Sequence, residues 1–92
     1  MRNAALLLIL LAAPAAAETI AVATSSAGAS ITLTTERGPC VGEARVAIWR
    51  SPDAQVSVPG CWVIAGKVVA VSFLDGDRGI IPLADFRKPA SL

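Results

Sequence analysis

The sequence predicts an all-β domain, a small antiparallel meander or SH3-like barrel of four to five strands with one short helical turn near the C-terminus. Segments rich in β-branched residues recur along the chain, and Gly, Pro and Asp gather between them. The 92 residues suffice for one small domain. Domains of this size commonly need covalent support, which two cysteines can provide.

The first seventeen residues have the order of a secretory signal peptide. Arg2 makes the start positive, residues 4–13 are an unbroken apolar run, and the alanines at 15–17 provide a cleavage site after Ala17. The run is shorter than the ~20 apolar residues of a membrane span. We expect a periplasmic or secreted protein with no stable membrane insertion after cleavage; an uncleaved N-terminal anchor is the alternative.

Three further regions follow the predicted signal peptide. Residues 18–29 are rich in Ala, Ser and Thr, which predicts a flexible leader, although Ile20 and Val22 are compatible with an edge strand. Residues 30–88 form the disulfide-bonded β domain, and residues 89–92 form a tail. Residues 18–92 contain seven basic and seven acidic side chains, so no electrostatic attraction to nucleic acid is expected. The expected partner is a protein or a second copy of the chain.

The sequence predicts the first three strands of the domain with different clarity. Residues 30–35, SITLTT, alternate as a half-buried strand does. Residues 43–50, EARVAIWR, favour a strand through their β-branched residues and Trp49, while Glu43 and Ala44 are also compatible with a helix. Residues 56–64 are a strand interrupted at Pro59-Gly60, and proline indicates an edge position or a bulge there.

Residues 67–74, KVVAVSFL, have the strongest strand pattern. A two-residue turn at Ala65-Gly66, with Gly66 at positive φ, pairs them with residues 59–64. One face then carries Trp62, Ile64, Val69, Val71 and Phe73, and the other carries Cys61, Val63, Val68, Ala70 and Leu74. Both faces are apolar, so the terminal segments, a second copy or a partner must cover one of them.

The C-terminal part is predicted from turn chemistry. Asp75 to Gly79 form a polar turn, because Asp and Gly are the residues that such turns use. Residues 79–83 form a last short strand, in which Pro82 suits an edge. Residues 84–88 are compatible with one helical turn that brings Phe86 into the core.

Cys40 and Cys61 are predicted to form a disulfide. They are the only two cysteines, in a chain that carries an export signal. Closing a loop of this length stabilises the fold by about 3 kcal/mol in the chain-entropy account. Their spacing is not that of a C-x-x-C redox motif, so a thioredoxin-like role is not expected.

The residue types exclude the ordinary Ser-His-Asp and Cys-His catalytic systems. The chain has no histidine, so it lacks the usual general base and the commonest zinc ligand. Asp75 and Asp77 flank Gly76, but the segment lacks the further oxygen ligands of a calcium loop. We therefore expect no enzyme activity, no catalytic residues, no metal and no cofactor; a small hydrolase using Asp75, Asp77 or Glu43 is the remote alternative.

A binding surface is the remaining class of site. Tryptophan and arginine are enriched among residues that dominate binding energy. We expect a possible interaction surface around Trp49, formed with Arg37, Arg45 and Arg50. The alternative is that Trp49 belongs to the core with the other three aromatic residues.

Several motifs in residues 40–86 carry a resemblance. They are Gly60-Cys61-Trp62, the valine-rich strand at 68–71, the Asp75-Gly76-Asp77 turn and the Pro82 to Phe86 ending. The chain resembles small exported proteobacterial proteins of unknown function that pair an upstream cysteine with a G-C-W strand. The resemblance implies a disulfide-bonded β domain of the cell envelope and carries no activity with it.

Two functional hypotheses follow. The first is a non-enzymatic envelope module that binds a protein or associates with itself. The second is a periplasmic inhibitor of a hydrolase, acting through the loop at 36–42 or the turn at 75–79; it rests on analogy with other small disulfide-bonded β domains.

Overall fold

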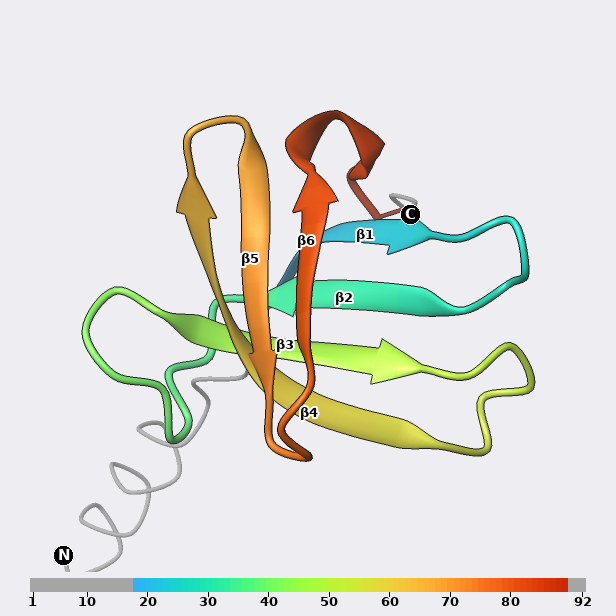
Figure 1. Cartoon of the computed structure of the whole chain (residues 1–92), viewed down its shortest axis with the longest axis horizontal. Coiled ribbons are helices and arrows are strands. Elements are labelled where there is room, and N and C mark those ends of the chain that lie inside the picture. Colours follow the sequence, from blue (N-terminus) through green and yellow to red (C-terminus); the bar gives the residue numbers. More distant parts are fainter. Residues whose placement is uncertain (1–17, 90–92) are drawn as a thin grey trace, which may run out of the picture.

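The computed structural model describes residues 18–89, and this part of the chain folds as a curled β-sheet. Its elements are β1 (Thr19–Thr24), β2 (Ser30–Thr34), β3 (Arg45–Arg50), β4 (Ser57–Ala65), β5 (Val68–Phe73), β6 (Arg78–Pro82) and the 3-10 helix η1 (Leu83–Asp85). Each strand pairs antiparallel with the next (Figure 1). The predicted all-β meander is confirmed. The predicted signal peptide, its cleavage site and residues 90–92 lie outside the described residues.

The sheet has six strands rather than four or five, because part of the segment expected to be a flexible leader is a strand. β1 pairs with β2, with a shift in register between Thr19 and Ala21. The other edge of β1 is also used: Val22 and Arg87 exchange two backbone hydrogen bonds of 2.8 and 2.9 Å. The strand pattern of residues 19–24 is weak, so their sequence alone does not predict a strand. Hydrogen bonds on both edges of β1 explain why these residues are ordered.

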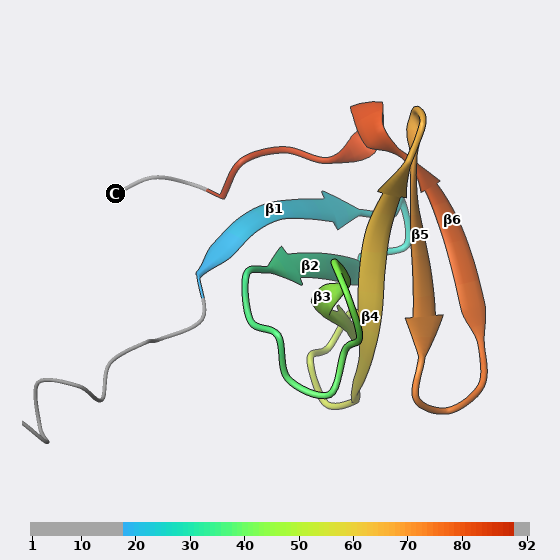
Figure 2. The same cartoon turned by 90° about the vertical axis from the view of Figure 1, so that its left-hand side faces the viewer.

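β4 is the strand about which the sheet curls. Its first part pairs with β3, its second part pairs with β5, and residues 60–62 pair with both. As a result, β5 and β6 run steeply across β1–β3, and the sheet forms a half-barrel (Figures 1 and 2). The chain after η1 then returns to β1 at Arg87.

The core lies on the inner face of this curl. A cross-strand row of Ala21, Leu33, Ala47 and Gly60 forms the floor that the β5–β6 hairpin covers. Leu33, Ala47, Val69 and Val71 are the buried centre. Six partly buried residues pack around them: Ala21, Ile31, Trp62, Phe73, Ile81 and Phe86. Phe86 therefore reaches the core as predicted, although it follows η1 rather than lying within it.

The predicted interruption at Pro59 was wrong, because β4 continues through it as a nine-residue strand. Pro59 pairs with β3, but the ladder with β5 begins only at Gly60, so on that side Pro59 does lie at an edge. Its carbonyl accepts a hydrogen bond of 3.0 Å from the Leu74 backbone N–H. The nitrogen of Pro59 faces the same side, one residue beyond the last residue of β5. The missing donor therefore costs no hydrogen bond within the ladder.

The β4–β5 turn lies one residue later than predicted. Ala65 pairs with Val68, so Gly66 and Lys67 form the two-residue turn, and Gly66 has φ of +67°. Glycine at the first central position is typical of a tight hairpin turn, which explains the shift. The register differs from the predicted one by two residues, so the same side chains share each face.

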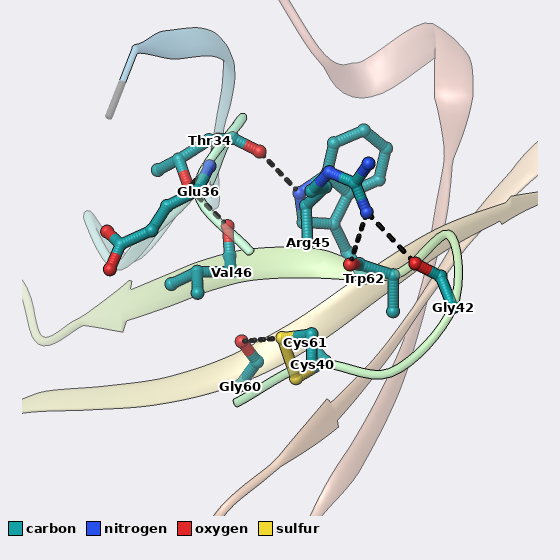
Figure 3. Close-up of a disulfide and its surroundings, with 10 residues drawn as sticks. Thr34, Glu36, Cys40, Gly42, Arg45, Val46, Gly60, Cys61 and Trp62 are labelled. Carbon is teal, nitrogen blue, oxygen red and sulfur yellow. Dashed lines mark hydrogen bonds between the residues drawn. A yellow bond between two sulfur atoms is a disulfide. The ribbon is translucent and has the colours of Figure 1, made fainter. Parts of the chain in front are cut away.

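The disulfide holds the long β2–β3 loop against the convex face. Cys40 and Cys61 are bonded, as predicted, with their Cα atoms 5.7 Å apart (Figure 3). Thr34 on the same face is buried, and its hydroxyl donates to the Val46 carbonyl at 2.8 Å and accepts from the Glu36 N–H at 3.2 Å. A disulfide of this kind points to a non-reducing compartment.

The close approach of β5 to β4 generates a stability prediction. A Cβ added at Gly60 would lie 2.6 Å from the Ser72 carbonyl oxygen and 2.9 Å from the Phe73 ring. We expect Gly60→Ala to lower the free energy of unfolding by about 1–3 kcal/mol, as overpacking does. Gly79→Ala is the control, because its Cβ would meet only side-chain carbons at 3.6 and 3.8 Å. Urea denaturation measures the free energy of unfolding of both variants. Equal stabilities of the two variants would contradict the close approach of β5 to Gly60.

Candidate functional site

The β5–β6 hairpin covers part of the inner face only incompletely. One step from the core row, a second cross-strand row joins Ala23, Ile31, Trp49 and Val58 across β1–β4. We call these four residues the Trp49 row. Figure 1 shows the ends of β1–β4 that carry this row extending beyond β6. The row is therefore an apolar strip beside the last strand of the sheet.

Two hollows lie between the Trp49 row and the hairpin, and Trp49 lines both. The smaller, of about 170 Å³, has Ile81 and Asp85 on its far side. The larger, of about 530 Å³, is bordered by Phe73 and the β5–β6 turn. Together the two hollows form what we call the Trp49 cleft. Trp49 is half-buried at its centre, with neither the full burial of a core residue nor full exposure.

The rim of the Trp49 cleft is mainly acidic. Asp75 and Asp77 lie at the larger hollow together with Arg78, and Asp85 lies at the smaller one. The Asp75 carboxylate accepts the backbone N–H of Asp77 at 3.0 Å, and Gly76 has φ of +98°. These features are those of the polar turn that the sequence predicts. Within residues 18–89, no three Cys, Asp or Glu side chains gather as metal ligands would.

Asp53 organises the β3–β4 loop beside the cleft. Its carboxylate accepts hydrogen bonds from the Ser51 hydroxyl at 2.7 Å and from the Gln55 backbone N–H at 2.9 Å. The Ser51 hydroxyl, followed by the Gln55 N–H, lowers the pKa of Asp53. A carboxyl whose pKa is lowered on folding stabilises the folded form above its ordinary pKa and stops doing so as the pH falls. Protonation of Asp53 at low pH therefore weakens the hydrogen bonds that order the β3–β4 loop.

The residues predicted to surround Trp49 do not form one surface with it. Arg45 shares the inner face but donates to the carbonyls of Gly42 and Ala44 at 3.1 and 2.9 Å, beside Trp62 (Figure 3). Arg50 lies on the opposite face of β3, where it donates to the Thr32 hydroxyl at 3.4 Å. Arg37 is exposed in the β2–β3 loop. Alternation along a strand separates residues that are neighbours in sequence.

Sequence reasoning missed the true neighbours of Trp49. Ile31 and Val58 face it across the two adjacent strands. Asp75 and Asp77 were interpreted as a turn, with catalysis or an inhibitory loop as alternatives, and the structure places both at the rim of the larger hollow. These neighbours follow from the register of β3 with β2 and β4. The sequence of a single strand does not reveal that register.

The convex side of the β4–β6 region carries a second apolar surface. Two cross-strand rows lie side by side there, Val63–Ala70–Ile80 and Ala65–Val68–Pro82. We call these six residues the convex array. Ile80 is 72% exposed and Val63 is 39% exposed. The sequence predicted two apolar hairpin faces of which one needs cover, and the convex array is the one left open in the described residues.

The β2–β3 loop presents one more apolar side chain. Val41, which follows the disulfide-bonded Cys40, is 85% exposed. Hydrogen bonds hold the loop on both sides: Cys40 N–H donates to the Arg37 carbonyl at 2.8 Å, and Ala44 N–H donates to the Val41 carbonyl at 3.1 Å. The loop therefore displays Val41 in a fixed position.

Comparison of the chain with protein-family models, with curated proteins and with solved structures finds no match. Among residues 18–89, no helix has the length and apolar character needed to cross a membrane.

Proposed function

We propose that this chain is an exported, non-enzymatic binding module that holds a segment of a partner protein in the Trp49 cleft. The observation that carries the proposal is the Trp49 row, a continuous apolar strip across four strands in which Ala23 is buried and Ile31, Trp49 and Val58 are only half-buried. Concave apolar sites with a few polar groups at the rim are typical of ligand binding. Tryptophan is among the side chains that contribute most to binding energy.

The compartment supports a protein ligand. The N-terminal seventeen residues have the order of a signal peptide, and the disulfide suits the periplasm or the extracellular medium. The equal numbers of acidic and basic residues after Ala17 favour a protein over nucleic acid. The lack of histidine favours binding over catalysis, since histidine is the usual general base near neutral pH.

A peptide selection tests the cleft. The exported protein is immobilised and offered a displayed library of random twelve-residue peptides, and enriched peptides are synthesised for titration calorimetry. We expect Trp49→Ala to weaken binding about thirtyfold or more, because it removes the central anchor. Val63→Ala on the convex array is the control and leaves the affinity unchanged. Failure to enrich any peptide that depends on Trp49 contradicts the proposal.

The convex array favours a second form of binding, which is self-association. The convex array carries no charged side chain among its six residues, and a second copy can cover it face to face. We expect light scattering to show a dimer and Ile80→Lys to convert it to a monomer, because the introduced charge would be buried. Val41→Lys, also at an exposed valine but outside the array, leaves the dimer intact. A monomeric wild-type protein rules this form out.

The inhibitor hypothesis is supported by Val41, which is exposed on a loop that hydrogen bonds hold in place. A loop that is already ordered loses little conformational entropy on binding, which favours insertion into an enzyme cleft. A panel of lysozymes and proteases at micromolar protein concentration tests the idea. We expect Val41→Asp to raise the inhibition constant about thirtyfold or more, as loss of a central contact does. Leu74→Asp, at another exposed apolar position, is the control, and the absence of any inhibition excludes this function.

A further inference from the structure

We infer that the ligand of the Trp49 cleft binds as an extended strand added to the free edge of β6. This inference rests on the proposed function and specifies the form of the ligand. Within the described residues β6 pairs only with β5. Its other edge borders the cleft, because Ile81 and Arg78 line the two hollows that also contain Trp49.

The hydrogen-bond pattern shows which backbone groups are free. Phe73 N–H donates to the Asp77 carbonyl, and Leu83 N–H donates to the Lys67 carbonyl, both at 2.8 Å. Residues of an antiparallel strand turn alternately toward and away from their partner. The odd-numbered residues of β6 therefore bond to β5, and the even-numbered ones face outward. Arg78 and Ile80 each present an N–H and a carbonyl at this edge, and Pro82 presents only a carbonyl.

The cleft floor matches what an added strand would place on it. An added strand lies about 4.8 Å from its neighbour and points alternate side chains to the same face. One set of ligand side chains then lies over the Trp49 row. The hollow of about 170 Å³ beside Ile81 has room for one apolar side chain, and the hollow of about 530 Å³ beside Phe73 has room for more than one.

The charged residues at the ends of the Trp49 cleft indicate which charges the ligand carries beside its apolar residues. Asp75 and Asp77 lie beside Arg78 at one end of the cleft, and Asp85 lies at the other. Asp85 also borders a neighbouring hollow together with Arg87 and Lys88, so the acidic excess is at the Asp75 and Asp77 end. A basic ligand residue complements that end. The ligand is therefore an extended peptide of a partner protein, with alternating apolar residues and a Lys or Arg at one flank.

The edge limits how long the added strand can be. β6 has five residues, and Pro82 at its end has no N–H to offer. Short edge strands and edge prolines prevent continuous strand stacking between copies of a protein. The free backbone groups of Arg78 and Ile80 can therefore form only a few hydrogen bonds. That number suits a short segment of a partner better than an open-ended assembly of copies.

Amide hydrogen exchange on the full exported protein tests the inference directly. The probe is a synthetic peptide enriched from the random twelve-residue library. We expect its saturation to slow exchange of the Arg78 and Ile80 amides at least about tenfold, as gain of a backbone hydrogen bond does. The Gly79 and Ile81 amides are the internal control, because they already bond to β5 and change little.

N-methylation of the same peptide, one residue at a time, gives the second readout. Strand addition predicts that affinity falls about tenfold at alternate positions only, because alternate N–H groups bond to β6. A peptide that needs Trp49 but tolerates methylation at every position, with unchanged Arg78 and Ile80 exchange, overturns strand addition and leaves the cleft function standing. The absence of any Trp49-dependent peptide overturns both. Slow Arg78 and Ile80 exchange in a peptide-free dimer places a second copy on the edge and also overturns the inference.

Discussion

The rest of the structure depends on the close crossing of β5 over Gly60. A side chain there would meet the Ser72 carbonyl at 2.6 Å, so only glycine lets β4 pair with both neighbours at this point. Ala47, the next residue in the core row, is also small and is completely buried. Because Gly60 and Ala47 are small, the hairpin packs closely on this end of the core row, beside the bulkier Trp49 and Val58. The same packing that closes the core thus leaves the cleft open.

The two faces of the sheet are stabilised by different means. Apolar packing of Leu33, Val69 and Val71 stabilises the inner face. The convex face beneath the β2–β3 loop relies on the disulfide and on the hydrogen bonds of Thr34, which is buried there. No buried side-chain nitrogen or oxygen in the described part of the chain lacks a partner. This division suits a domain too small to build a thick core, since small domains bury a modest fraction of their surface.

Local chemistry in the sequence predicted most of the fold but little of the cleft. The fold class, the cysteine pair and the faces of the β4–β5 hairpin follow from composition, compartment and alternation, which are local signals. β1 was only an alternative to a flexible leader, because its order comes from pairing with β2 and with Arg87, which its own residues do not reveal. The strand was predicted to be interrupted at Pro59, but it is continuous because the β5 ladder begins only at Gly60. The interaction surface predicted around Trp49 stays a prediction, and the arginines assigned to it are neighbours of Trp49 only in sequence.

The single bridge between Val22 and Arg87 has a consequence for the order in which the chain folds. Every other strand pairing joins sequence neighbours, and a topology of local contacts folds fast. Each strand can therefore pair with the preceding one before the rest of the chain is in place. The Val22–Arg87 bridge spans nearly the whole domain, so it forms last. Until Arg87 arrives, β1 exposes an unpaired edge, and the nascent domain is most prone to aggregate in that interval.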